Sequence, residues 1–263
     1  MDSKQQRILA RQLRDQKSMQ PVDCACVIHG DAYGMEYVEK LYHMLDTYIR
    51  RPVRLHVFTE AHRSVPEPFI KHDLIPWPGV HGPRKSWWYK MQMFDSRHLG
   101  SVPVLYLDLD VIIVGELDWI WQLDHRNFYA IRDFKCLWRQ DWQGMNSSVM
   151  FWTPTEWHKV WEDFQSQNIE ITVKQFHGDQ DFLNQAIQGP RRQYFDQTCM
   201  KSWRWQLKDG GLDTKSKQYH RPDAGTVLDP QTRIMIFHGR PKPHEVQDPI
   251  IQKFWHDLPL ISG

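Results

Sequence analysis

The sequence has few cysteines and no long apolar run. Its four cysteines (Cys24, Cys26, Cys136 and Cys199) lack the spacing of a metal site, and the first two lie in an apolar, strand-like run typical of small buried side chains. No stretch of about 18 apolar residues is present, so we expect no membrane span. No N-terminal segment has the pattern of a cleavable signal peptide. A reduced, cytoplasmic protein is therefore the default expectation.

The net charge is small and the tryptophan content is large. With Lys+Arg 33 against Asp+Glu 32, the formal net charge of +1 gives no general attraction to nucleic acid. A hydrophobic content of 41% over 263 residues is enough for one large α/β domain or two small ones. Flat indole rings that stack on pyranose faces would explain part of the surplus of tryptophan, which numbers 13.

Residues 1–20 contain no glycine and no proline. They carry several basic side chains and few apolar ones. This composition fits a basic helix that packs weakly on the rest of the chain, or a contact with a membrane surface or a partner. We therefore predict a basic helical leader over residues 1–20 and one domain over residues 21–263.

Strand-like and helix-like segments alternate along that domain. Apolar runs predict strands, and apolar side chains at helical spacing predict helices. The predicted strands are 23–28, 53–58, 104–114, 127–131, 149–152 and 233–237, and the predicted helices are 35–49, 87–97, 154–164, 180–187 and 249–258. Residues 194–225 show little periodicity and are predicted to be a loop. The order predicts an α/β fold with a mixed, mainly parallel central sheet flanked by helices.

The run Val104–Val114 contains the most informative feature. Two carboxylates, Asp108 and Asp110, interrupt an apolar segment that is typical of a strand buried on both faces. Such a strand holds charges only when they are paired or bind a cation. Alternation would place both on one side, with Leu109 opposite, as hard-oxygen ligands for Mg²⁺ or Mn²⁺. The alternative is a pair of solvated acids in a loop.

Polar segments follow several of the predicted strands. Ligands of open α/β sheets bind beyond the carboxyl ends of the strands. The segments in those positions are 29–33, 59–60, 108–110, 146–148 and 238–242. Each is polar, so we predict that the functional site is built from them.

This ordered set of motifs resembles glycosyltransferases of the GT-A fold, and most of all family eight, which includes glycogenin. The resemblance rests on Val27–Tyr33, Trp88–Met91, Asp108–Asp110, Asn146–Val149 and Gly178–Asn184. It implies a Rossmann-like single domain that transfers a hexose from a nucleotide sugar, such as a UDP-hexose, to a saccharide or glycoconjugate acceptor. It also implies retention of the anomeric configuration and Mn²⁺ or Mg²⁺ as the cofactor.

Positions that match the family carry the implied roles. The implied donor-binding residues are Val27, Ile28, His29, Tyr33, Thr59, Lys90, Asp108, Leu109, Asp110, Asn146, Ser147, Ser148, Gly239 and Lys242. The implied catalytic residues are Asp179, Gln180 and Lys242, and the implied metal ligands are Asp108, Asp110 and His238. Asp179 would be either the nucleophile of a covalent intermediate or a group that orients a sugar hydroxyl. Front-face attack is the other route to retention.

The closing motif departs from the family pattern. Family eight separates its histidine from the following glycine by two residues, whereas His238 here stands directly before Gly239. His238 could still turn a ring nitrogen toward Mn²⁺, and Lys242 could still meet a diphosphate as a point charge. The other interpretation of His238 is a histidine that is hydrogen-bonded in a tight turn.

Two other functions are compatible with these motifs. A haloacid-dehalogenase-type phosphohydrolase also has D-x-D after an apolar strand, although normally after the first strand of its fold. A sugar-binding relative without catalysis is the second alternative. For an acceptor path, the candidates are Trp138, Trp142, Trp203 and Trp205, which could instead pack structurally.

Overall fold

The computed structural model describes residues 20–80 and 85–261, so residues 1–19 of the predicted leader lie outside the described part. The strands are β1 (Val22–Val27), β2 (Val53–Thr59), β3 (Ile70–Asp73), β4 (Val104–Leu107), β5 (Val111–Ile113), β6 (Phe128–Arg132), β7 (Met145–Trp152), β8 (Arg192–Tyr194), β9 (Met200–Ser202) and β10 (Ile234–Ile236). The helices are α2 (Met35–Tyr48), α3 (Ser96–Leu99), α4 (His158–Gln165), α5 (Ile169–Gln175), α6 (Asp179–Ala186) and α7 (Pro249–Ile251). Within the described residues, no helix is long and apolar enough to cross a bilayer.

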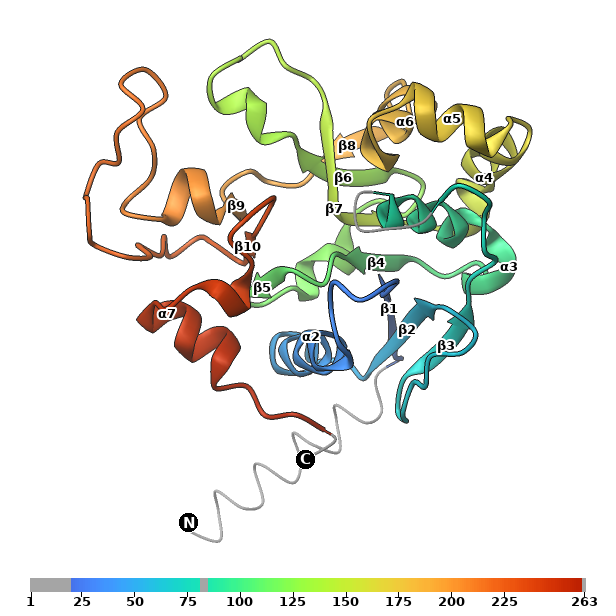
Figure 1. Ribbon diagram of the computed structural model, residues 1–263, viewed down its shortest axis with the longest axis horizontal. Coiled ribbons are helices and arrows are strands. Elements are labelled where there is room, and N and C mark those ends of the chain that lie inside the picture. Colours follow the sequence, from blue (N-terminus) through green and yellow to red (C-terminus); the bar gives the residue numbers. More distant parts are fainter. Residues whose placement is uncertain (1–19, 81–84, 262–263) are drawn as a thin grey trace, which may run out of the picture.

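A seven-stranded sheet forms the centre of the molecule, in the order β3-β2-β1-β4-β7-β6-β8 (Figure 1). Strand β7 is antiparallel to both of its neighbours, and the other pairings in this sheet are parallel. Strands β5, β10 and β9 form a second, three-stranded sheet. The prediction of an α/β fold with a mixed, mainly parallel central sheet is confirmed.

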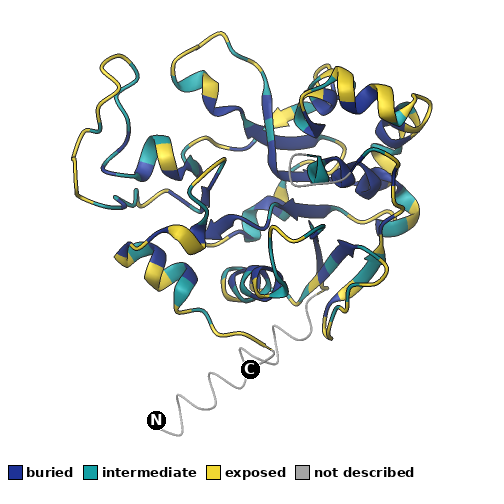
Figure 2. Cartoon of the chain, viewed as in Figure 1, coloured by how far each residue is buried: buried dark blue, intermediate teal, exposed yellow. Residues whose placement is uncertain are grey.

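The large sheet is buried on both faces because helices cover both. Alternate residues of β1 point to opposite sides: Cys24 and Cys26 join the cluster with Leu41 of α2, and Ala25 joins the cluster with Trp161 of α4. The central strands β1, β4 and β7 are accordingly almost entirely buried, and the exposed positions lie on loops, on the outer faces of helices and on the outlying strands β2, β3 and β8 (Figure 2). Polar side chains therefore gather where strands end.

The Val104–Val114 run is not one strand, so that prediction was wrong. Strand β4 ends at Leu107 and pairs with β1 and β7, whereas β5 begins at Val111 and pairs with β10 in the small sheet. The backbone N–H of Asp108 still donates to the carbonyl of Ser148, at 2.8 Å. Strands β4 and β5 are both apolar because both are buried. An apolar sequence indicates burial, but it does not indicate which of the two sheets a strand joins. The two carboxylates stand where the chain passes between the sheets.

Other differences follow from long-range pairing. Residues 194–225 are not all loop, because β9 pairs in parallel with β10, and a π-helical turn follows at Trp203–Leu207. The predicted helix 87–97 is a 3₁₀ segment, Ser86–Phe94, followed by the short helix α3. Trp203 is buried against Phe237, with ring centroids 4.8 Å apart, and therefore packs the core.

Candidate active site

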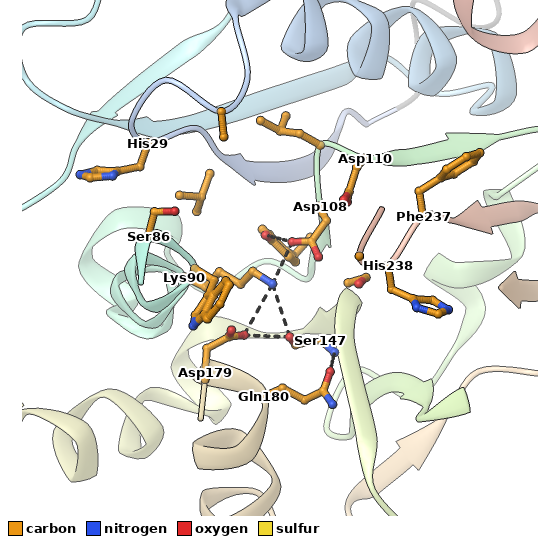
Figure 3. A pocket seen from close by; sticks show the side chains of 18 of the residues that line it. His29, Ser86, Lys90, Asp108, Asp110, Ser147, Asp179, Gln180, Phe237 and His238 are labelled. Atoms are coloured by element: carbon orange, nitrogen blue, oxygen red, sulfur yellow. Dashed lines mark hydrogen bonds and ion pairs between the residues drawn. The ribbon is translucent and has the colours of Figure 1, made fainter. Parts of the chain in front are cut away.

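A cavity of about 810 Å³ opens where β1 and β4 end. Because β7 is antiparallel, its beginning lies at the same edge, next to the N-terminus of α6 (Figure 3). The segment after β10 closes the cavity. The predicted residues that line it are Val27, His29, Tyr33, Lys90, Asp108, Leu109, Asp110, Ser147, Ser148, Asp179, Gln180, His238, Gly239 and Lys242. Residues far apart in sequence thus meet at the sheet edge that the strand-end rule indicates.

Three predicted donor-binding residues do not line this cavity. Ile28 is 1% exposed and belongs to the core. Thr59 is fully buried, and its hydroxyl donates to Oε2 of Glu60 at 2.9 Å. Asn146 accepts a hydrogen bond from the backbone N–H of Ser148 at 3.0 Å, so it shapes the start of β7. The structure assigns these three side chains to supporting the wall rather than to forming it.

Lys90 is the centre of a buried charge cluster. Its Nζ lies 2.8 Å from Oδ1 of Asp108 and 3.5 Å from Oδ2 of Asp179, and it donates to Oγ of Ser147 at 3.4 Å (Figure 3). Burial disfavours the ammonium form, but Asp108 and Asp179 outweigh burial and raise the pKa of Lys90. Tyr106 also donates to Oδ1 of Asp108, at 2.5 Å. Lys90 is therefore a fixed positive charge in the cavity wall.

The start of α6 is tied to β7 by side-chain hydrogen bonds. The Ser147 hydroxyl donates to Oδ2 of Asp179 at 2.7 Å, and the Ser147 backbone N–H donates to Oε1 of Gln180 at 3.3 Å. Gln180 in turn donates to Oδ2 of Asp133 at 3.1 Å. Burial raises the pKa of Asp179, although Lys90 and Ser147 oppose that shift. Asp179 stands in the first turn of α6, where the helix dipole favours a carboxylate.

Asp110 has a separate set of partners on the other side of the cavity. The Tyr33 hydroxyl donates to its Oδ2 at 3.1 Å, and the Lys242 ammonium pairs with the same oxygen. Burial raises the pKa of Asp110, Lys242 opposes the rise, and the nearby charge of Asp108 adds to it. Burial and then Asp110 also raise the pKa of Tyr33, so its hydroxyl remains a donor. Each carboxylate of the D-x-D motif thus pairs with a different lysine: Asp108 with Lys90, and Asp110 with Lys242.

The two carboxylates fit a divalent cation by their chemistry and charge. With all groups ionised, Asp108, Asp110 and Asp179 carry three negative charges, against two positive charges on Lys90 and Lys242. A hard cation held by carboxylate oxygens would compensate the remainder. The part of the chain that the structure describes contains no assembled group of three or more His, Cys, Asp or Glu side chains able to hold a metal. The predicted three-ligand set is therefore not assembled here.

The predicted ligand set is not assembled because the His238 ring has other partners. Its Nε2 is 2.7 Å from Oγ of Ser202, and its ring lies against Phe134 and Trp205, with the Trp205 ring centroid at 4.1 Å. Figure 3 shows the ring directed away from Asp108 and Asp110. Burial, and then the charge of Arg204, lower the pKa of His238 to about 4, so the ring is neutral at pH 7. In this structure His238 is a hydrogen-bonded histidine at a turn, which is the second of the two interpretations above.

The opposite end of the cavity is built around His29. Its ring stacks on Tyr89 with centroids 4.0 Å apart and an interplanar angle of 22°. The next residue, Gly30, donates its N–H to Oε1 of Glu60 at 2.6 Å, and Arg63 donates to Gly30 O at 2.7 Å. Burial opposes ionisation of Glu60, but Arg63 and the Gly30 N–H outweigh it and lower its pKa to about 2. Tyr89 is buried and does not line the cavity, so it holds the His29 ring from behind, and that ring is the flat, cavity-lining group suited to stacking of an aromatic ligand ring.

Sequence reasoning missed several lining residues. They are Ser86, Trp87, Tyr106, Asp133, Lys135, His177 and Phe237, whereas the lining residues Ala32, Gly178 and Asp181 lie within segments that the sequence singled out. Tyr106 could have been predicted, because it lies two residues before Asp108 and side chains two residues apart in a strand point to the same side. Asp133 was also predictable, because it follows the predicted strand 127–131, and β6 runs in the same direction as β4, so its carboxyl end lies at the same edge of the sheet.

Several solved structures of glycosyltransferases share the fold of this chain. It matches the galactosyltransferase LgtC, solved in complex with donor and acceptor sugar analogues, with a TM-score of 0.61 and 16% identity over 89% of this chain and 94% of that one. It matches GlyE of Streptococcus pneumoniae with a TM-score of 0.61 and 19% identity over 90% of this chain and 60% of that one. The bifunctional glycosyltransferase WbbM matches at 0.56, with 10% identity over 85% and 46%.

The structural likeness is not accompanied by a match in sequence. No protein-family model matches the chain, and no curated protein matches it either. At these identities the structural matches establish the fold, which is the GT-A fold of glycosyltransferases. Membership of family eight stays a prediction.

Proposed function

We propose that this protein transfers a hexose from a nucleotide sugar, in our expectation a UDP-hexose, to a hydroxyl group of a saccharide or glycoconjugate acceptor. The observation that carries the proposal is the convergence of Asp108 and Asp110 with Asp179, Gln180 and Lys242 on one cavity. The fold shared with glycosyltransferases supports it. The phosphohydrolase alternative loses its basis, because here D-x-D follows β4 rather than a first strand.

The residues divide the work of donor binding. We assign the His29 ring, which Tyr89 supports from behind, to the nucleobase, and Asp108 and Asp110 to Mn²⁺ or Mg²⁺. When bound, such a cation would screen the charge that develops on the departing diphosphate. Lys242 stands beside Asp110 and would supply a positive charge to the same group.

The chemical step exchanges one bond to the anomeric carbon for another. The acceptor oxygen bonds to that carbon, and the bond from carbon to the phosphate oxygen breaks, with its electron pair remaining on the diphosphate. The hydroxyl proton passes to a released phosphate oxygen or to solvent. The Oδ2 atom of Asp179 is engaged by Ser147 and Lys90, which favours a role in orienting a sugar hydroxyl over a role as nucleophile. We therefore favour retention by front-face attack.

Removal of Asp110, one of the two proposed metal ligands, tests the proposal. Asp110→Ala should abolish Mn²⁺-stimulated cleavage of UDP-hexoses and weaken UDP binding measured by calorimetry in the presence of Mn²⁺, while circular dichroism shows the fold intact. The matched control is Asp46→Ala, which removes an exposed carboxylate from α2. Undiminished wild-type turnover in EDTA would overturn the metal assignment. Absence of cleavage for every nucleotide sugar tried would instead favour the sugar-binding alternative without catalysis.

A further inference from the structure

Two long loops meet beside the candidate active site. One runs over residues 133–144 between β6 and β7, and the other over 203–233 between β9 and β10 (Figure 1). They touch through Trp138 and Trp205, whose rings stand edge to face with centroids 4.6 Å apart and an interplanar angle of 79°. Trp205 also lies against His238, which lines the donor cavity. Aromatic surface therefore continues from the cavity wall out to the loops.

Trp205 contacts His238 of the donor cavity and also lines a second pocket. This second pocket, of about 540 Å³, is lined by Trp205 itself, by Leu137 of the first loop and by Lys201 of β9. Trp138, the neighbour of Leu137, is 39% exposed, which is unusual for a large aromatic side chain. The cavity wall at His238, the two indoles and the second pocket thus form one path.

Positive charge accompanies this path. Lys135 lines the donor cavity, Lys201 lines the second pocket, and the Lys217 ammonium stands 5.6 Å from the Trp138 ring centroid. None of the three forms an ion pair with another described residue. Asp229 is the carboxylate in the wall of the second pocket. Unpaired cations beside the exposed indole of Trp138 and the half-buried indole of Trp205 favour a ligand that combines sugar faces with negative charge.

We propose that this path is the acceptor site, and that the acceptor is an oligosaccharide bearing a carboxylate or phosphate on a unit remote from the reacting hydroxyl. The inference rests on the proposed function for the identity of the reaction. The terminal sugar enters beside His238, the following units stack on Trp138 and Trp205, and Lys201 and Lys217 meet the acidic group. A monosaccharide would leave the indoles and the second pocket unfilled.

Binding to a glycan array tests the site independently of catalysis. The array should contain neutral, uronate-containing and phosphorylated oligosaccharides together with monosaccharides. We expect acidic oligosaccharides to be bound preferentially, and the uronate and phosphate arms tell which acid is recognised. Trp138→Ala should weaken the best ligand about tenfold or more, as expected for loss of a stacked indole, and Trp138→Phe should restore part of the affinity.

A charge variant completes the test. Lys217→Ala should weaken acidic glycans several-fold and neutral ones little, whereas the control Lys215→Ala, an exposed lysine of the same loop, should change neither. Preference for neutral glycans or for monosaccharides, no bound glycan, or affinity unchanged by Trp138→Ala would each overturn the proposal. Donor cleavage by the wild type without acceptor is measured separately. If that cleavage fails while Trp138-dependent binding persists, the reaction assignment falls and the glycan site stands.

Discussion

The two lysines of the candidate active site, Lys90 and Lys242, hold the two carboxylates of the D-x-D motif in different ways. Lys90 comes from a buried 3₁₀ segment, its side chain is 8% exposed, and it contacts both Asp108 and Asp179. Lys242 comes from the loop after β10, its side chain is 23% exposed, and Asp110 is its one ion-pair partner among the described residues. The comparison indicates that Lys90 is part of the scaffold, whereas Lys242 is free to exchange a carboxylate for a ligand.

The largest difference should appear in stability. Lys90→Met leaves the buried carboxylate Asp179 and the partly exposed carboxylate Asp108 without their cation, so we expect a loss of about 3 kcal/mol in the free energy of unfolding. Lys242→Met is the matched control and should lose about 1 kcal/mol or less, because the Lys242 side chain is more exposed and the Tyr33 hydroxyl still donates to Asp110. Urea denaturation at pH 7 measures both. Equal losses would mean that the two lysines do not differ as the structure indicates.

The Lys90→Met deficit should also depend on pH. The pKa of Asp179 is already raised by burial, and loss of Lys90 removes the largest influence that opposes the rise. Folding then favours the protonated carboxyl, so the deficit relative to wild type should shrink as pH falls toward 4. A deficit that stayed constant from pH 8 to pH 4 would show that the loss comes from packing rather than charge.

Removal of Lys242 should have a small effect on stability but a large effect on turnover. If its charge acts mainly as the sugar–phosphate bond breaks, Lys242→Ala should lower kcat by roughly 10²-fold, with a smaller rise in donor KM. Lys242→Arg keeps the charge and should recover part of the rate. Steady-state kinetics with varied donor concentration separate the two constants. Normal turnover in Lys242→Ala would place the diphosphate partner elsewhere.

The smallest effect concerns a histidine cluster outside the cavity, where a fall in pH should destabilise the fold, in contrast to its effect at the buried carboxylate Asp179. Burial, and then the charges of His56 and His98, lower the pKa of His72 to about 4, with Asp73 opposing. The unfolded chain, with a histidine pKa of 6.5, therefore binds more protons between pH 6.5 and 4. Stability should fall as pH drops through that window.

The variant His72→Gln should flatten part of this decline. Thermal or urea unfolding followed from pH 7 to pH 4 measures the slope for the wild type and the variant. His43→Gln changes a histidine of α2 outside this cluster and is the control. An unchanged slope in His72→Gln would assign the acid sensitivity to other groups whose pKa burial lowers, such as His238 with a pKa of about 4.

The sequence alone determined the sheet class and most of the site. Apolar alternation and helical spacing identified β1, α2 and β2, and the strand-end rule correctly predicted that His29, Asp108 and Lys242 meet at one edge of the sheet. These inferences worked because they depend on local periodicity and on the cost of burying charge. Neither requires knowledge of which strands pair.

Only the tertiary structure decided what long-range contacts control. It divided the run around Asp108 between two sheets, and it made β9 a strand by pairing it with β10. It turned His238 toward Ser202 and joined Trp138 to Trp205 across two loops. A residue's type and its near neighbours in sequence set its burial and its conformational preference. The residue that it contacts is set by packing of the whole chain. At this site those contacts hold Lys90 in the scaffold and leave Lys242 available to a ligand.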